Sequence, residues 1–239
     1  MTVLLVGAGG VAHPVAVALA AAGVRSLRVC DDDQVERTNL HRQILFGDGD
    51  VGRSKLDALA AHLAASSPGI EVELRDTRFT PDTALDLLAG VDLVIDACDN
   101  FATRFLVADA AHLAGVPSVH GAAVRWTATA MASPPGGRPC YRCLFEDLPS
   151  GDAPDCATAG VAGPVCGVAG ALAADLALRI LAGDASAYGR VATFDGLADR
   201  LRVVPVRPRP GCSLCDRGAA SLDLDPRRYV TTDCFAGPA

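Results

Sequence analysis

Short apolar runs alternate with longer segments of helical spacing along the first half of the chain. The run from Val3 to Val6 is apolar at every position and stops at the glycine-rich segment 7–10. Such a run is typical of a strand that is buried on both faces, and therefore of a parallel sheet. Pro14 early in the next segment and Gly23 at its end predict a helix between them.

The same alternation continues to about residue 121. Each further strand is a short apolar run, and each helix between the strands has apolar residues on one face. The predicted strands are 27–30, 70–74, 92–96 and 118–121, and the predicted helices are 55–65, 81–88 and 102–114. This order predicts an α/β fold of the Rossmann-like, doubly wound kind with a mostly parallel sheet.

The pattern changes after residue 122. Val124 to Ala132 has the pattern of a strand that arrives without a helical crossover, so we expect it to pair in the antiparallel sense. The most apolar helix, Val165 to Leu181, is expected to pack on the sheet. Two later strands, 191–194 and 201–206, are predicted to close the sheet as a pair.

One domain with a tail is predicted. Residues 146–164 are rich in Pro, Gly, Asp and Ala and form a long loop, which compact domains usually keep for a functional reason. Residues 216–239 have little apolar periodicity and are expected to form a flexible tail. We therefore expect a single domain over residues 1–215.

Composition and charge exclude several classes of protein. Half of the 239 residues are hydrophobic, which is enough for a sizeable core and excludes extensive disorder. A net charge of −7 argues against nucleic acid or an anionic membrane as the main partner. No uncharged apolar run reaches about 18 residues, and the N-terminus lacks the basic segment of a secretory signal. We therefore expect a cytoplasmic protein without a membrane-spanning segment.

Gly7, Gly9 and Ala12 lie between the first predicted strand and helix with the spacing of a dinucleotide-binding loop. Glycines there allow backbone N–H groups to approach phosphate, and Asp31 at the end of the next strand can accept from ribose hydroxyls. The alternative is a tight strand-to-helix turn without a ligand. NAD and ATP share an adenosine ribose, so the motif predicts a nucleotide without identifying it.

Nine cysteines are a high count for a chain without an export signal. Two C-x-x-C pairs supply the four thiolates of a tetrahedral structural zinc site: Cys140, Cys143, Cys212 and Cys215. Neither pair begins a predicted helix, where a thiolate would be activated, so zinc is favoured over a redox pair or chance core cysteines. Three other cysteines are expected in the core: Cys30, Cys98 and Cys166. The five histidines show no ligand spacing and are interpreted as structural or surface residues.

A series of ordered motifs resembles the ThiF/MoeB/HesA family of E1-like adenylyltransferases. The motifs are Gly-Ala-Gly-Gly at 7–10, Asn-Leu-x-Arg-Gln at 39–43, Asp-Asn-Phe-x-Thr-Arg at 99–104, Cys-Tyr-Arg-Cys-Leu at 140–144, Thr-Ala-Gly-Val at 158–161 and the last C-x-x-C. The resemblance runs from about residue 3 to Cys215. It implies ATP-dependent adenylylation of the C-terminal Gly-Gly carboxylate of a ubiquitin-like sulfur-carrier protein, for thiamine, molybdopterin or a related product.

The resemblance also implies roles for individual residues. Arg42 and Lys55 would neutralise the phosphates of ATP, Asp99 would bind Mg²⁺, and Asn39 would hold a phosphate or ribose oxygen. The other residues implied in nucleotide binding are Gly7, Gly9, Gly10, Asp31, Asp33, Gln43 and Asn100. Without the resemblance, Arg42 and Lys55 would be interpreted as solvated surface charges and Asp99 as a helix N-cap.

Cys156 lies where ThiF-like members carry a cysteine on the loop at 146–164, which they use as a crossover loop. The resemblance implies that its thiol can form a covalent link to the carrier protein. From the residues alone Cys156 is no obvious nucleophile, because the adjacent Asp155 disfavours the thiolate, and an inert loop cysteine is the alternative. The further partners that the resemblance implies are a second copy of the chain, in a homodimer, and a sulfurtransferase or cysteine desulfurase.

One departure from the family concerns the N-terminus. Six residues precede Gly7, whereas family members usually carry a helical arm that delivers an arginine to the partner's ATP. Arg53 is the candidate to replace it. Two other functions stay open: an inactive E1-like scaffold that binds the carrier protein, and an NAD-dependent oxidoreductase. The oxidoreductase explains the glycine-rich loop but neither the 39–43 motif nor the cysteine pairs.

Overall fold

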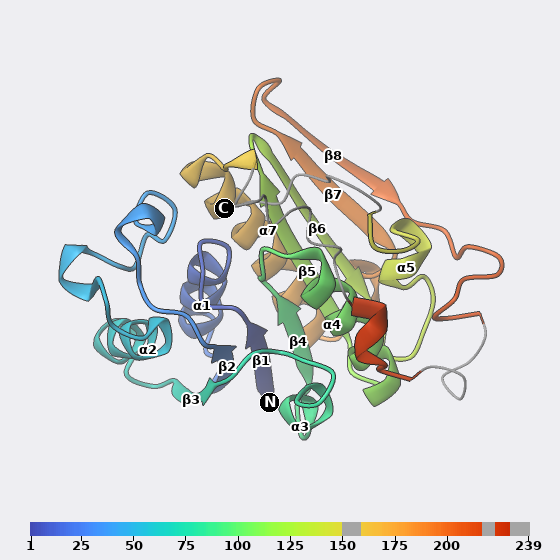
Figure 1. Cartoon of the computed structure of the whole chain (residues 1–239). Coiled ribbons are helices and arrows are strands. Elements are labelled where there is room, and N and C mark those ends of the chain that lie inside the picture. Colours follow the sequence, from blue (N-terminus) through green and yellow to red (C-terminus); the bar gives the residue numbers. More distant parts are fainter. Residues whose placement is uncertain (150–158, 217–222, 230–239) are drawn as a thin grey trace, which may run out of the picture.

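Eight strands form one continuous sheet in the computed structural model of the chain, which describes residues 1–149, 159–216 and 223–229. The strands are β1 (Thr2–Val6), β2 (Ser26–Asp31), β3 (Glu71–Asp76), β4 (Leu93–Asp96), β5 (Ser118–Val124), β6 (Thr127–Ser133), β7 (Arg190–Asp195) and β8 (Arg200–Pro205). Their order in the sheet is β3-β2-β1-β4-β5-β6-β7-β8 (Figure 1). The first five strands are parallel and the last three are antiparallel, as predicted.

Helices cover both faces of the sheet, which confirms the doubly wound α/β fold. One face carries α1 (Ala12–Ala21), α2 (Lys55–Ser66) and α7 (Gly163–Leu181), and the other carries α3 (Ala84–Leu88), α4 (Phe101–Ala114) and α5 (Tyr141–Leu144). Residues of β1 alternate between the two layers, Leu5 packing in the cluster with α1 and Leu4 in the cluster with α4. Both are 0% exposed, which explains the uninterrupted apolar run in the sequence.

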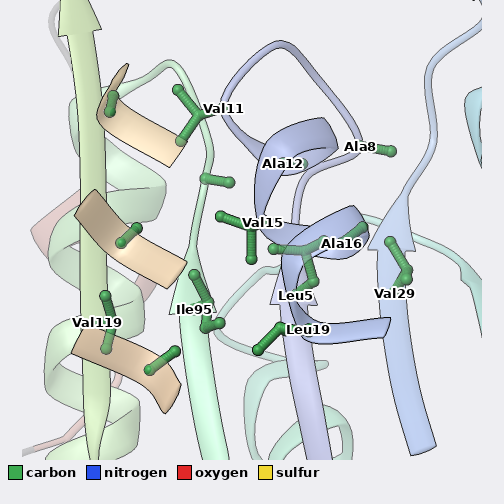
Figure 2. Close-up of a cluster of buried hydrophobic side chains, with 14 of the residues drawn as sticks. Leu5, Ala8, Val11, Ala12, Val15, Ala16, Leu19, Val29, Ile95 and Val119 are labelled. Atoms are coloured by element: carbon green, nitrogen blue, oxygen red, sulfur yellow. The ribbon is translucent and has the colours of Figure 1, made fainter. Parts of the chain in front are cut away.

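α1 is packed tightly onto the parallel strands. Figure 2 shows Val15 and Leu19 of α1 beside Leu5 of β1 and Ile95 of β4. All four side chains are fully buried. Because truncating a buried leucine costs about 2–5 kcal/mol, this layer holds the start of α1, and the loop before it, firmly against the sheet.

α7 is the apolar helix that the sequence predicts, and it lies against β5, β6 and α1. Among the described residues it is also the one helix long and apolar enough to cross a membrane, with a mean hydropathy of 1.6. Ala169, Ala173 and Ala177 are 0% exposed and pack in the main hydrophobic cluster, whereas Asp175 and Arg179 interrupt the apolar surface. Its apolar character is therefore explained by its place in the core.

The predicted helix 81–88 is the main difference in the parallel half. The structure has a turn over residues 80–83, and α3 begins only at Ala84. The Thr83 hydroxyl accepts from the Thr80 N–H at 3.0 Å and donates to the Arg78 carbonyl oxygen at 2.7 Å. These bonds compete with helical hydrogen bonding, so the first predicted turn is not helical.

Part of the predicted tail is packed against the domain. A short 3₁₀ helix, η5 (Pro226–Tyr229), lies beside α4 (Figure 1). Tyr229 is buried, and its hydroxyl donates to Asp109 Oδ2 at 2.8 Å. The described residues 223–229 therefore differ from the expected flexible tail, because a buried polar contact holds them. Flexibility of the rest of the tail stays a prediction.

Candidate functional site

A cavity of about 680 Å³ lies at the carboxyl ends of the parallel strands. Doubly wound sheets bind ligands at this edge, where connections leave neighbouring strands toward opposite faces. The cavity is lined by every residue assigned above to nucleotide binding: Gly7, Gly9, Gly10, Asp31, Asp33, Asn39, Arg42, Gln43, Lys55, Asp99 and Asn100. The structure thus brings these residues together, and their individual roles stay predictions.

The glycine-rich loop leads from β1 into α1. Gly7 has a φ of +92°, and a Cβ there would lie 3.2 Å from the Ala97 carbonyl oxygen, so any other residue would be strained. A Cβ at Gly10 would lie 2.9 Å from the Arg42 carbonyl oxygen, so glycine allows the arginine-bearing loop to approach. The residues just before α1 line the cavity, where a helix N-terminus favours anions.

Asp31 fixes the glycine-rich loop from the end of β2. Its Oδ2 accepts from the Ala8 N–H at 2.7 Å, and its Oδ1 accepts from the Asp33 N–H at 2.8 Å. Burial raises the pKa of this carboxyl, while Lys55 and the two hydrogen bonds act in the opposite direction. Each carboxylate oxygen keeps a second lone pair, so both can still accept from a ribose hydroxyl.

His13 joins the glycine-rich loop to the segment that follows Gln43. Its Nε2 donates to the Ala8 carbonyl oxygen at 3.2 Å, and its Nδ1 accepts from the Leu45 N–H at 3.1 Å. Because the Leu45 N–H can only donate, this pairing assigns a neutral ring with the proton on Nε2. Burial lowers the pKa of His13 to about 4, in keeping with a neutral ring. No spacing in the sequence could have indicated this bridge.

The two cations expected to bind phosphate, Lys55 and Arg42, both lie along the cavity. Lys55 is 7% exposed, and its Nζ lies 2.7 Å from Asp33 Oδ2. Arg42 is half-buried, and its Nη2 donates to Asn39 Oδ1 at 2.6 Å. The alternative of a solvated surface charge is therefore wrong for Lys55, because its ammonium is buried. A buried ammonium needs an anionic partner, which Asp33 supplies.

Gln43 and Asp99 present oxygens that have no hydrogen-bond partner within the described ranges. Gln43 is 2% exposed and its Oε1 is buried, whereas Asp99 is exposed. Asn100, rather than Asp99, caps α4, because its Oδ1 accepts from the Thr103 N–H at 2.8 Å. The N-cap alternative for Asp99 is therefore wrong, and its carboxylate is free for another ligand.

Acidic side chains outnumber basic ones around the cavity. The acidic residues are Asp31, Asp32, Asp33, Glu36 and Asp99, and the basic residues are Arg42, Lys55 and Arg78. Two of the cations are already paired, Lys55 with Asp33 and Arg78 with Asp32. A triphosphate would add negative charge, so its binding here favours a divalent cation held between phosphate and carboxylate oxygens.

A buried polar network lies beneath the cavity, and of its members only Arg104 belongs to one of the sequence motifs. Asp96 is 0% exposed and accepts from His120 Nδ1 at 2.9 Å and from the Cys98 thiol at 2.7 Å. Burial opposes its ionisation, but Arg104 and His120 outweigh burial and hold the pKa of Asp96 below its usual value. Burial, and then Asp96, raise the pKa of Cys98, so this thiol stays protonated. Cys98 thus lines the cavity as a hydrogen-bonded thiol rather than as a plain core residue.

The two cysteine pairs meet outside the cavity, which none of their four residues lines. All four sulfur atoms lie within 4.8 Å of one another, and neighbouring Sγ–Sγ distances include 3.4, 3.5 and 3.8 Å. Four thiolates at about 2.3 Å from a tetrahedral zinc would be about 3.8 Å apart, so the cluster, formed by Cys140, Cys143, Cys212 and Cys215, fits that metal.

One expectation about the cysteines is wrong. Cys140 immediately precedes the short helix α5, whereas neither pair was expected to begin a helix. The difference arises because four residues of helix are too few to leave a periodic signal. With four sulfurs gathered, and the Arg209 N–H lying 3.4 Å from Cys143 Sγ, the arrangement is still that of a thiolate metal site rather than a redox pair.

Cys156 lies outside the described residues. The described end of its loop is held at the β5–β6 turn, where the Arg125 N–H donates to the Gly160 carbonyl oxygen and the Ala162 N–H donates to the Arg125 carbonyl oxygen, both at 2.9 Å. Val161 lines the cavity. The loop at 146–164 therefore reaches the edge of the cavity at its C-terminal end.

Comparisons with known proteins match nearly all of the predicted domain. The ThiF family matches residues 1–214. A SAMP-activating enzyme E1 of Haloferax volcanii is 41% identical over 227 residues, which cover 93% of this chain and 84% of that protein. A sulfur carrier protein adenylyltransferase of Thermus thermophilus is 42% identical over 243 residues, which cover 99% of this chain and 88% of that protein.

Other matches are longer than this chain. The adenylyltransferase and sulfurtransferase MOCS3 of Mus musculus is 43% identical over 216 residues, and the match covers 89% of this chain but 47% of that protein. The chain thus spans about half the length of that relative. The crystal structure of E. coli MccB with ATP superposes with a TM-score of 0.78 at 24% identity, covering 90% of this chain and 66% of that one. This likeness shows the fold alone.

Proposed function

The chain belongs to the ThiF family, and we propose that it transfers AMP from ATP to the C-terminal Gly-Gly carboxylate of a ubiquitin-like sulfur-carrier protein. The observation that carries the proposal is the convergence of Arg42, Lys55 and Asp99 on one cavity beside the glycine-rich loop. The names of two relatives, a SAMP-activating enzyme E1 and a sulfur carrier protein adenylyltransferase, support the same activity. Thiamine, molybdopterin or a related compound would be the end product.

The cavity offers a place for each part of ATP. The N-terminus of α1 and the cations Arg42 and Lys55 suit the phosphates, and Asp31 suits the ribose. Lys55 would exchange part of its contact with Asp33 for a phosphate oxygen, so the ammonium remains paired throughout. Gln43 Oε1, which is buried without a protein partner in the described part, would gain one from the ligand or its water.

Asp99 is the residue best suited to hold Mg²⁺. Its carboxylate is exposed to the cavity and has no partner among the described side chains, and Mg²⁺ prefers hard oxygen ligands with most of its water shell retained. The ion would neutralise phosphate charge in a cavity that is otherwise rich in carboxylates. The excess of acidic side chains around the cavity is the feature of this chain that fits such an ion.

The reaction needs positioning more than proton transfer. An oxygen of the carrier carboxylate attacks the α-phosphorus and forms the acyl–phosphate bond, while the bond to the β-phosphate oxygen breaks and pyrophosphate leaves with the electron pair. The carboxylate is already ionised at neutral pH, so no general base is required. Arg42 and Lys55 would stabilise the charge that develops on the phosphate oxygens, in a site where the donors are already placed.

The cysteine cluster would hold a structural zinc ion. Its four sulfurs come from two segments, α5 and the loop around Cys212, which are far apart in the sequence. A bound ion would supply a crosslink between these segments and so contribute folding free energy. None of the four cysteines lines the cavity, and we assign the cluster no part in the transfer of AMP.

Cys156 would act after adenylylation. Its thiolate could attack the acyl carbon of the adenylate, forming a thioester as the bond to AMP breaks, or it could take part in a persulfide-derived linkage. Val161, at the cavity edge, is five positions further along the chain, and five extended residues span at most about 18 Å. The chain would act as a homodimer, in which Arg53 takes the place of the arginine that a partner's arm would deliver. A sulfurtransferase or cysteine desulfurase would be a further partner.

Exchange of labelled pyrophosphate into ATP tests the function. Exchange should require both the chain and a carrier ending in Gly-Gly, and a carrier lacking the final glycine should serve as the control. The alternative is a scaffold that binds the carrier without activating it. Tight carrier binding without any exchange would favour that scaffold and contradict the proposed function.

A further inference from the structure

The segment that follows the cysteine cluster returns to the cavity. Residues 223–229 lie against α4, ending in the 3₁₀ helix Pro226–Tyr229, drawn in red in Figure 1. Tyr229 lines the cavity together with residues between Val6 and Ala123, and with Val161 and Cys166. It is therefore the most C-terminal residue of the lining, more than 60 positions after Cys166. It is 9% exposed, so its ring is part of the cavity wall rather than a side chain in solvent.

Tyr229 is held by a buried ionic pair. Its hydroxyl donates to Asp109 Oδ2 at 2.8 Å, and Asp109 is 0% exposed. The same carboxylate accepts two hydrogen bonds from Arg142, at 2.7 Å from Nε and 2.9 Å from Nη2. The Arg142 guanidinium in turn stacks over the Phe105 ring at 4.8 Å. Such a fully paired network fixes the position of the tyrosine ring.

The part of the cavity that Tyr229 lines is apolar. Phe79, Leu106 and Tyr229 all line the cavity, and all three belong to one hydrophobic cluster on the α4 side of the sheet. Phe79 follows β3, the neighbour of the strand that ends in the ribose-binding candidate Asp31. Leu106 lies on α4 and Tyr229 lies beside it, so the apolar wall is on the α4 side of the cavity. Flat aromatic and aliphatic surfaces suit a purine ring, whereas the charged end suits phosphates.

We propose that Tyr229 contacts the base of the bound nucleotide, and that the Asp109–Arg142 pair is the positioning device that holds the tyrosine ring there. The proposal rests on the proposed function, because it takes ATP to be the ligand of this cavity. It assigns residues 223–229 to the nucleotide site, although they lie beyond the part of the chain that matches the ThiF family. Tyr229 thereby sets affinity for the nucleoside end of the ligand and leaves the phosphate end unaffected.

Two probes separate this role from a general effect on folding. The dissociation constants of ATP and of inorganic tripolyphosphate would be measured by calorimetry for wild type, Tyr229→Leu, Tyr229→Phe and Tyr188→Leu. Tyr229→Leu keeps a buried apolar side chain without the ring, and Tyr229→Phe keeps the ring without the bond to Asp109. Tyr188 is half-buried and does not line the cavity, so Tyr188→Leu is the matched control.

Tyr229→Leu should raise the dissociation constant of ATP about tenfold and leave that of tripolyphosphate unchanged, because loss of aromatic stacking on a base has this magnitude. Tyr229→Phe should cause a smaller rise, and Tyr188→Leu none. Equal ATP affinity in wild type and Tyr229→Leu, or equal weakening of both ligands, would overturn the inference alone. Failure of the wild-type chain to bind ATP would overturn the proposed function, and the inference with it.

Discussion

Lys55 and Asp33 form an ion pair in which Nζ lies 2.7 Å from Oδ2, at the wall of the nucleotide cavity. The two partners differ in environment, since the lysine side chain is 9% exposed and that of the aspartate is 55% exposed. A nearly buried ammonium with a solvent-accessible partner can donate a hydrogen bond to a phosphate oxygen without first being desolvated. This arrangement accounts for a cation that is paired in the protein and still available to a ligand.

Loss of the charged groups should abolish activation of the carrier. Lys55→Ala, Arg42→Ala and Asp99→Ala should each lower the rate of ATP–pyrophosphate exchange by about 10²- to 10³-fold, as expected for groups that stabilise charge in the transition state. Circular dichroism should show that the fold is kept. Arg37→Ala is the matched control, because Arg37 is an exposed arginine paired with Asp48 that does not line the cavity. Normal exchange in all three cavity variants would mean that ATP binds elsewhere.

The cysteine cluster should contain one zinc ion per chain. Cys143→Ser should release the metal and lower Tm, because binding of a structural metal is coupled to folding. Elemental analysis and thermal unfolding measure the two effects. Cys234→Ser, a cysteine outside both C-x-x-C pairs, should change neither. Protein purified without chelators and free of zinc would contradict the assignment.

Cys156 should be needed only after the adenylate has formed. Cys156→Ala should leave pyrophosphate exchange nearly intact, because the attacking group in that step is a carboxylate, but it should prevent any thiol-reversible adduct between chain and carrier. Intact-mass spectrometry of a mixture of chain, carrier, ATP and a sulfur donor detects the adduct. An adduct that persists in Cys156→Ala would identify a different thiol, and the absence of one in wild type would indicate an enzyme that only adenylylates.

His13 should make stability depend on pH. The pKa of His13 is about 4 in the folded chain and 6.5 for a histidine in the unfolded chain. Between these pH values the unfolded chain binds more protons, so the free energy of unfolding falls as the pH falls. The contribution is complete above pH 6.5 and is lost toward pH 4, a change of about 3 kcal/mol. The free energy of unfolding, measured with urea at pH 7 and at pH 4.5, should differ less between the two pH values for His13→Gln than for wild type, because glutamine does not titrate. Equal pH dependence in both proteins would contradict a neutral, buried His13.

The parallel half of the fold and the lining of the cavity could be predicted from sequence because their signals are local. Val3 to Val6 is a continuous apolar run because both faces of β1 are covered, and Gly7 and Gly10 are glycines because the backbone there requires it. Asp31 ends a strand two positions from β4 in the sheet, so topology alone places it near Asp99. These relationships follow from strand ends and turn residues.

The remaining contacts depend on side chains that only the folded chain brings together. Asp96 and His120 are 24 residues apart, and Tyr229 and Asp109 are 120 apart, and neither pair belongs to a spacing motif. The place of Tyr229 could not be predicted because its segment has little apolar periodicity, and its buried contacts are with residues far away in the sequence. Helix α5 is too short to leave a periodic pattern, so the position of Cys140 before it could not be predicted.

Adenylylation of the carrier is tested most directly by detecting the acyl-adenylate itself. The chain would be mixed with ATP, Mg²⁺ and a ubiquitin-like carrier ending in Gly-Gly, with pyrophosphatase added to draw the reaction forward, and the carrier would be weighed by mass spectrometry. Wild type should yield a carrier that has gained one AMP, and Lys55→Ala should yield an unmodified carrier. An unmodified carrier with wild type, under conditions in which the two proteins bind, would show that the chain does not adenylylate the carrier.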